Sequence, residues 1–127
     1  MTKVLILDDE VDIVSAMAEA FEYAGHEPPD VVTTAEEAMR MMGLNEYRLV
    51  VIDAKLSGRI SGIDVIRFCR GLPALPRIFA MSGITRTDFT EILKKEGVMD
   101  MVEKVLEKPV DIQPRDFVLR LERMGLV

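Results

Sequence analysis

Short runs of consecutive apolar residues alternate along the chain with longer stretches in which apolar residues recur at helical spacing. Three runs are well defined, at residues 3–7 (KVLIL), 49–52 (LVVI) and 77–81 (RIFAM). Continuous apolar character, rather than alternation of apolar and polar positions, is typical of strands covered on both faces of a parallel sheet. The pattern therefore predicts three central strands of such a sheet.

Two further strands are predicted from weaker signals. Val31 and Val32 follow a pair of prolines, and because proline cannot donate a hydrogen bond to a sheet ladder, this strand is expected at an edge. A last strand is expected at residues 105–107. The stretch 97–104 before it is ambiguous, because it could prolong the preceding helix by a turn or begin the strand early. We favour the additional helical turn.

Five helices are predicted between and after these strands. Thr33 or Thr34 is expected to cap the second helix, and Thr87 the fourth. The third is expected over about 63–70, and the fifth follows Pro114. The residues at helical spacing that are expected to face the core are Ile13, Val14, Met17, Ala18, Phe21, Ala24, Ala38, Met41, Met42, Phe89, Ile92, Leu93, Phe117, Val118 and Leu121.

The order of elements is βαβαβαβαβα, and right-handed crossovers turn such a repeat into a doubly wound sheet with helices on both faces. We therefore expect an α/β fold with a five-stranded parallel sheet in the flavodoxin-like order 2-1-3-4-5. The 127 residues are expected to form one domain, residues 1–127, without repeats. The final helix is expected to leave no room for an attached output domain.

Composition narrows the classes of function. The net charge is −6 with 16 basic residues and no basic stripe, which argues against nucleic-acid binding by this domain. Neither a signal peptide nor a membrane-spanning stretch is indicated, and Cys69 alone cannot form an internal disulfide. These features predict a cytoplasmic protein without membrane contact. Cys69 is expected to fill the core, and His26 to be exposed and idle.

Three carboxylates come at the ends of predicted strands. Asp8 and Asp9 close the first strand, and Asp53 closes the strand at 49–52. In the expected order these two strands are neighbours, so the side chains converge where doubly wound sheets place their ligands. Anions gathered in one cleft repel each other, and a hard cation held by oxygen ligands removes that problem. The sequence therefore predicts a Mg²⁺ site.

Two other groups are expected at the same edge. Ser82 follows the strand at 77–81 and offers a hydroxyl, and Lys108 follows the last strand and offers a positive charge. A metal site, a carboxylate, a hydroxyl and an ammonium together suit phosphoryl transfer, in which a carboxylate can be the nucleophile and hold the phosphoryl group covalently. The simpler readings are a solvated turn for the acid pair, a loop serine and a surface lysine. The joint placement of all these residues at strand ends favours a site over them.

With these residues, the chain resembles the response-regulator receiver domains of two-component signalling, particularly the single-domain chemotaxis-type regulators. The resemblance covers nearly the whole chain. The motifs that carry it are the acid pair in LILDDE, Asp53 in LVVIDAKLSG, Ser82 in FAMSG and the pair Lys108-Pro109.

The resemblance implies a role for each site residue. Asp9 would ligate Mg²⁺ directly, Asp8 partly through water, and the Lys55 carbonyl would complete the protein ligands. Asp53 would be both ligand and phosphoacceptor. Ser82 and Lys108 would contact the phosphoryl oxygens, and the Lys108–Pro109 bond would be cis.

The resemblance also implies that the chain is a phosphorylated partner rather than an enzyme. The expected partners are a sensor histidine kinase or a histidine phosphotransfer protein, together with an unknown downstream protein. A weak homodimer through the last two helices is an open alternative.

The chain departs from the usual receiver pattern in four places, one of which is the region before the last strand. Val105 stands where receivers usually carry Phe or Tyr three residues before the lysine, so the aromatic rotamer switch has no side chain to use. Ser57 replaces a common proline, and the loop to Gly62 is one residue longer. The alternative is therefore a receiver-like binding module that does not switch. A Mg²⁺ phosphohydrolase is the third hypothesis and lacks material for a substrate pocket.

Overall fold

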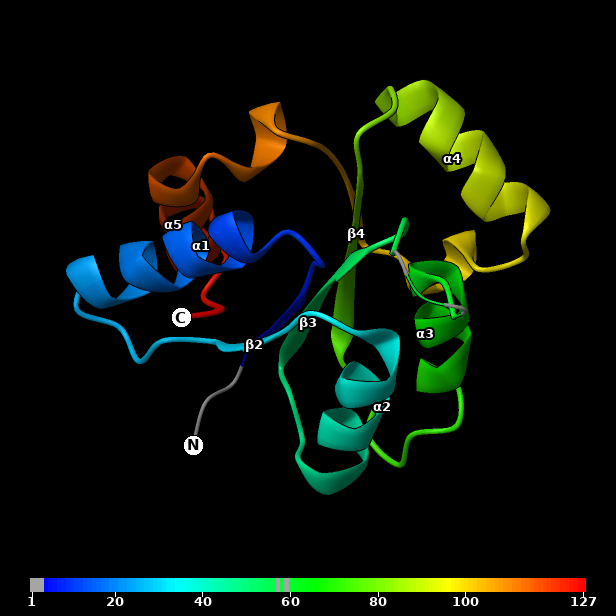
Figure 1. Cartoon of the computed structure of the whole chain (residues 1–127), viewed down its shortest axis with the longest axis horizontal. Coiled ribbons are helices and arrows are strands. Elements are labelled where there is room, and N and C mark those ends of the chain that lie inside the picture. Colours follow the sequence, from blue (N-terminus) through cyan, green and yellow to red (C-terminus); the bar gives the residue numbers. More distant parts are fainter. Residues whose placement is uncertain (1–3, 57, 59) are drawn as a thin grey trace.

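Five parallel strands form one sheet in the order β2-β1-β3-β4-β5 (Figure 1). The computed structural model describes residues 4–56, 58 and 60–127. The strands are β1 (Val4–Leu7), β2 (Asp30–Val32), β3 (Leu49–Asp53), β4 (Arg77–Ser82) and β5 (Lys104–Glu107). The α-helices are α1 (Val11–Tyr23), α2 (Ala35–Leu44), α3 (Gly62–Cys69), α4 (Arg86–Lys95) and α5 (Pro114–Arg123), and the 3₁₀ helices are η1 (Met99–Met101) and η2 (Val110–Ile112).

The predicted fold class and strand order are confirmed. All neighbouring strands pair in parallel, and β2 lies at one edge as its flanking prolines indicated. The first residue of the predicted first strand, Lys3, lies outside the described residues, as does Ser57 of the loop after β3. β3 and β4 each extend one residue beyond the predicted apolar run, so Asp53 and Ser82 are the last residues of their strands.

Two layers of helices bury both faces of the sheet (Figure 1). On one face, Leu49 and Val51 of β3 pack in a core with residues of α1 and α5. On the other face, Val50 and Ile52 pack in a second core with residues of α2, α3 and α4. Because alternate residues of a strand point to opposite faces, a strand covered on both sides must be apolar throughout. This is why the central strands appear as continuous apolar runs.

Helix α4 differs from its prediction at two points. Thr85, and not Thr87, is the residue that caps it, since the Thr85 side chain accepts a hydrogen bond from the backbone N–H of Asp88. Phe89 and Leu93 are buried as expected, but Ile92 is 40% exposed. Ile92 lies about 100° around the helix from Leu93 and falls at the margin of the buried stripe. Ala24, at the end of α1, is also exposed, because it is the capping residue beyond the last helical turn.

The segment 97–104 contains an additional helical turn, but this turn does not prolong α4. Gly97 has a φ of +73°, a conformation that ends the helix and that glycine adopts without strain. The turn is the separate 3₁₀ helix η1 (Met99–Met101), and β5 begins after two further residues, at Lys104. The prediction of an additional helical turn is therefore correct, but the prediction that this turn prolongs α4 is wrong, because the chain changes direction at Gly97.

Two isolated residues also have defined environments. His26 is not idle, because its Nε2 atom lies 2.7 Å from Oε2 of Glu122 in α5 and so ties the segment after α1 to the last helix. Cys69 is fully buried between α2 and α3, as expected for a core residue. Burial raises the pKa of the Cys69 thiol to about 11.

Gly62 at the start of α3 lies directly against the strand that ends in Asp53. A Cβ atom at residue 62 would be 1.9 Å from the Asp53 carbonyl oxygen and 2.8 Å from the Cα of Ala54. Both atoms are backbone, so neither can move aside cheaply. By contrast, a Cβ at Gly43 in α2 would meet nothing within 4 Å. The approach of α3 to β3 therefore requires glycine at position 62.

We expect Gly62→Ala to lower the free energy of unfolding by about 3 kcal/mol or more, because α3 must move away from β3. The matched variant Gly43→Ala should leave stability unchanged or raise it by up to about 1 kcal/mol, because alanine is the better helix former. Urea unfolding measures both. Similar free energies of unfolding for Gly62→Ala and the wild type would contradict the close packing described here.

Candidate functional site

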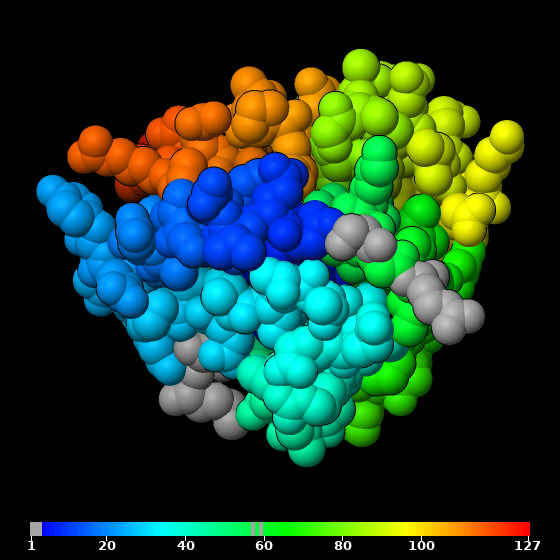
Figure 2. All heavy atoms as spheres, in the orientation of Figure 1, coloured from blue at the N-terminus to red at the C-terminus, as the bar shows by residue number. Residues whose placement is uncertain are grey.

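Two buried carboxylates meet at the carboxyl edge of the sheet. Asp8 follows β1 directly and Asp53 ends β3, and these strands are hydrogen-bonded neighbours with Leu7 opposite Ile52. Asp8 is 0% exposed and Asp53 is 3% exposed. The sheet order thus brings together residues that lie far apart in the sequence, as predicted. Figure 2 shows the dark-blue segment after β1 between the orange segment around η2 and the green segment after β3.

Lys108 places its ammonium group among three carboxylates. The Nζ atom lies 2.8 Å from Oδ2 of Asp8, 2.9 Å from Oε1 of Glu10 and 3.1 Å from Oδ2 of Asp53. Its backbone N–H donates to the carbonyl oxygen of Ser82 at 2.8 Å, which fixes the start of its side chain at the end of β4. One cation therefore compensates the carboxylates that the sheet gathers. The Lys108–Pro109 bond is cis, as the resemblance implied.

The electrostatics of the cluster do not balance fully. The pKa of Asp53 is raised from 3.8 to about 6, first because burial disfavours the charged form and then because Asp8 repels it. Lys108 and the backbone N–H of Lys55 oppose this shift without cancelling it. Burial would lower the pKa of Lys108, but its contacts with Asp8, Glu10 and Asp53 outweigh burial and raise that pKa above its usual value. The site thus has an excess of negative charge.

Glu10 is a residue of this site that the sequence interpretation missed. Carboxylate oxygens of Asp8, Glu10 and Asp53 all lie within 4.8 Å of one another. The backbone N–H of Glu10 donates to Oδ1 of Asp8 at 2.9 Å, so a tight turn carries Glu10 back over the site. The available signal was the third acid in LILDDE. Asp9 lines the same cleft, which has a volume of about 570 Å³, but it is outside this three-carboxylate cluster.

The donor set fits a hard divalent cation such as Mg²⁺. All ligands that the cluster offers are oxygens, and the cluster contains neither cysteine nor histidine. Within the described part of the chain, Oδ2 of Asp8 is a buried oxygen that lacks a hydrogen bond of good geometry, although the Lys108 ammonium lies beside it. That oxygen already has the Lys108 ammonium as its cationic neighbour, so a metal ion bound there would share the oxygen with Lys108 or displace it. The residues present therefore fit the predicted metal.

Lys55 and Ser82 lie at the same edge as the acidic cluster. The backbone N–H of Lys55 donates to Oδ1 of Asp53 at 3.2 Å, so the loop after β3 folds over the carboxylate, while ligation through the Lys55 carbonyl stays a prediction. Ser82 is 7% exposed and follows Met81, the residue opposite Asp53 in the sheet. Its hydroxyl accepts a hydrogen bond from the backbone N–H of Ile84 at 3.4 Å.

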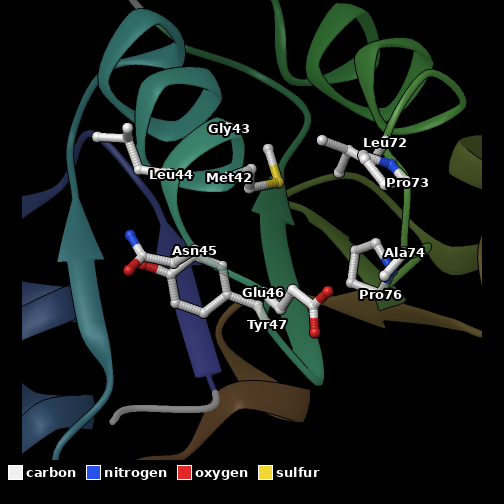
Figure 3. Close-up of a pocket in the computed structure, with 10 residues that line it drawn as sticks. All are labelled: Met42, Gly43, Leu44, Asn45, Glu46, Tyr47, Leu72, Pro73, Ala74 and Pro76. Carbon is white, nitrogen blue, oxygen red and sulfur yellow. The ribbon is translucent and has the colours of Figure 1, made fainter.

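Another cavity, of about 220 Å³, lies between the loops α2–β3 and α3–β4 (Figure 3). Figure 3 shows Met42, Leu72 and Pro76 among its walls. The lining residues include one carboxylate, Glu46, and the nearby Tyr47 hydroxyl already donates to Asp30 at 2.6 Å. These loops precede β3 and β4, at the edge of the sheet opposite to Asp53. The cavity therefore has no part in the chemistry of the acidic cluster.

Known proteins share both the sequence pattern and the fold. A family model described as "Response regulator receiver domain" matches residues 4–113. The response regulator SaeR of Staphylococcus aureus (strain USA300) is 29% identical over 125 residues, which are 98% of this chain and 50% of that protein. The chain thus spans about half the length of the curated relatives it matches.

Solved structures show the same fold. A CheY-like receiver domain from Methylobacillus flagellatus is 25% identical, with a TM-score of 0.72 over 94% of this chain and 97% of that one. The receiver domain of the Francisella response regulator 1452 is 22% identical, with a TM-score of 0.78 over 98% and 96%. The response regulator TrrA of Thermotoga maritima, solved in complex with Mg²⁺ and BeF, is 20% identical, with a TM-score of 0.74 over the whole of both chains.

The raised pKa of Asp53 predicts that its charge destabilises the ion-free fold near neutral pH. The pKa of the Asp53 carboxyl is 3.8 in the unfolded chain and about 6 in the folded one. Such a group stabilises the fold at pH values below 3.8, where it is protonated, and this stabilisation is lost as the pH rises through about 6. Asp53→Asn should therefore raise the free energy of unfolding by about 1–2 kcal/mol at pH 7.5 in the presence of a chelator. The gain should shrink towards pH 4.

Thermal unfolding at several pH values tests this expectation. Asp100→Asn is the matched control, because Asp100 lies in η1 before β5, at the other edge of the sheet, and its side chain is 66% exposed in an ion pair with Arg70. Exposed pairs of this kind contribute at most about 1 kcal/mol, so the control should not gain stability. An Asp53→Asn variant that is less stable than the wild type at pH 7.5 would mean that Lys108 fully compensates the cluster.

Proposed function

Because the chain belongs to the response regulator receiver domains of two-component systems, we propose that Asp53 accepts a phosphoryl group from a phosphohistidine and that the chain thereby switches its protein contacts. The observation that carries the proposal is the position of Asp53. Its carboxylate ends β3, faces a cleft and lies within 4.8 Å of the carboxylates of Asp8 and Glu10, with the Lys108 ammonium between them.

In the proposed transfer, Asp53 is the nucleophile. One of its carboxylate oxygens bonds to phosphorus while the phosphorus–nitrogen bond of the phosphohistidine breaks, and the leaving imidazole nitrogen keeps the electron pair. The pKa of about 6 leaves Asp53 mainly ionised at neutral pH, which a nucleophile requires. Lys108, hydrogen-bonded to Asp53, lies where it can neutralise the charge of the incoming phosphoryl group.

Asp8, Asp9, Asp53 and the Lys55 carbonyl are the proposed ligands of Mg²⁺, and Glu10 is close enough to take part. Bound there, the cation would neutralise phosphoryl oxygens and bring them within reach of Asp53. The cluster of carboxylate oxygens, which contains neither cysteine nor histidine, supports this assignment. After transfer, we propose that the Ser82 hydroxyl exchanges the Ile84 N–H for a phosphoryl oxygen, and that Lys108 pairs with another.

The proposed partners are a sensor histidine kinase or a histidine phosphotransfer protein, together with a downstream protein that recognises the phosphorylated form. The domain acts as phosphoacceptor rather than as an enzyme, and its net charge of −6 argues against nucleic-acid binding. No helix among residues 4–56, 58 and 60–127 is long and apolar enough to cross a membrane. We propose that it works in the cytoplasm, where such kinases present their phosphohistidine.

The alternative is a receiver-like module that binds one partner without switching. Val105 stands in the place of the usual aromatic residue, is half-buried and packs against the core. Because valine has no ring, the aromatic switch of many receivers has no counterpart here. The acidic cluster itself favours the switching domain, because a static module has no need of three carboxylates around one lysine.

Incubation with Mg²⁺ and acetyl phosphate should add the mass of one phosphoryl group to the wild type. Asp53→Asn should abolish the increase, because asparagine offers no anionic oxygen. Intact-mass spectrometry measures the product, and Asp100→Asn is the control that keeps the increase. A chelator should prevent phosphorylation of the wild type.

Two other outcomes would redirect the assignment. If neither acetyl phosphate nor a Mg²⁺–beryllofluoride mixture changes the wild-type mass or amide spectrum, the static module is the better description. If small phosphate esters are turned over in many cycles, the chain is a hydrolase and Asp53 is its nucleophile rather than a stable acceptor.

A further inference from the structure

The loops that carry Ser82 and Lys108 are joined by backbone contacts at the end of the sheet. Ser82 and Glu107 are register partners in the β4–β5 pair, and the carbonyl oxygen of Ser82 accepts the N–H of Lys108 at 2.8 Å. Beyond Lys108 the chain turns into η2, and Oδ2 of Asp111 accepts the backbone N–H of Glu107 at 2.8 Å. Asp111 thus closes the turn from which Lys108 reaches into the site.

The same turn is bonded to the first residue of α4. The backbone N–H of Arg86 donates to Oε1 of Glu107 at 3.0 Å, and the Nη2 atom of Arg86 donates to Oδ2 of Asp111 at 2.5 Å. The Glu107 carboxylate therefore lies at the N-terminus of α4, where the helix dipole favours negative charge. Oδ2 of Asp111 therefore accepts two hydrogen bonds, one from the backbone N–H of Glu107 and one from the guanidinium of Arg86.

This connection is shielded from water on its Asp111 side, while the Arg86 side chain is 59% exposed. The Asp111 side chain is 12% exposed, so its bond to Arg86 is less screened than a pair in which both partners are solvated. Burial alone would raise the pKa of Asp111, but the Glu107 N–H and the Arg86 guanidinium outweigh burial and hold that pKa below its usual value. Asp111 is therefore held as an anion in a fixed place.

The opposite end of α4 is anchored to α3. The Nη2 atom of Arg67 donates to the carbonyl oxygen of Glu96 at 2.9 Å and to its Oε1 at 2.6 Å. Arg70 donates to the carbonyl oxygen of Gly97 at 2.8 Å and pairs with Asp100. Because the C-terminal end of α4 is held at two successive residues, a force applied at Arg86 would pivot the helix about that end.

We propose that Arg86 and Asp111 are positioning residues that make the Ser82 loop, the Lys108 turn and the start of α4 move as one unit. This ionic link would transmit the state of the site in place of the aromatic side chain that position 105 lacks. The inference rests on the proposed function: when Ser82 and Lys108 are drawn towards a phosphoryl group on Asp53, Arg86 follows, and the surface formed by α4 changes.

Backbone amide spectra of the full chain with and without Mg²⁺ and beryllofluoride test the link. In the wild type, adding the phosphoryl mimic should shift amide signals near Asp53, in the turn at Lys108 and along α4 as far as Ile92 and Leu93. In Arg86→Gln, the shifts near Asp53 should persist, while those of Ile92 and Leu93 should fall by about half or more, because the two loops are uncoupled. Beryllofluoride binding should weaken by about fivefold.

Matched variants separate coupling from simple loss of an ion pair. Arg77→Gln removes the pair between Arg77 and Glu103 at the other end of β4 and β5, and should keep the full α4 response. Arg86→Lys retains a cation within reach of Asp111 and should restore most of the response. Asp111→Asn, which removes the anion from the other side, should reproduce Arg86→Gln.

The outcomes distinguish the link from the function on which it depends. A wild type that responds to beryllofluoride, together with an Arg86→Gln variant that shows the full α4 response, would overturn the link and leave the proposed function intact. An equal loss in Arg77→Gln would also overturn it, because the effect would then be one of general stability. A wild type that does not respond with Mg²⁺ present would overturn both proposals.

Discussion

The structure depends on the balance between buried carboxylates and one lysine. Asp8 and Asp53 lie at adjacent strand ends with almost no exposure to water, and Glu10 folds back over them. Burial and mutual repulsion disfavour such a group of charges, and the ion pairs of Lys108 with all three carboxylates offset part of this cost. The compensation is incomplete, as the raised pKa of Asp53 indicates, and this remaining negative charge favours a bound cation.

The doubly wound sheet explains how a small domain can hold this unfavourable group. Both faces of the central strands are buried by helices, so the strands are fixed in position by apolar packing that does not involve the site. Their carboxyl ends then carry polar side chains with little freedom to move apart. Gly62 contributes to the same rigidity, because it lets α3 approach the backbone of Asp53 more closely than any other residue would allow.

Phosphorylation of Asp53 would act on two loops that are already connected. Ser82 and Lys108 are joined by backbone bonds, and Asp111 and Arg86 extend that connection to the start of α4. Arg67 in α3 and Arg70 directly after α3 hold the other end of that helix. A receiver domain with valine at position 105 therefore has a route from the site to its surface that does not require an aromatic ring, which bears on the choice between a switching domain and a static module.

The sequence alone determined the fold class and the positions of Asp8, Asp53, Ser82 and Lys108 at strand ends, because continuous apolar runs and the residues that end them are local features. The strand order followed from the general rules for doubly wound sheets rather than from any local feature. Only the tertiary structure shows that Glu10 joins the carboxylate cluster, that Arg86 pairs with Asp111, and that His26 contacts Glu122. Each of these depends on a turn or on a distance between segments far apart in the chain. Periodicity gives the face on which a residue lies, but only the packed structure gives the partner it meets there.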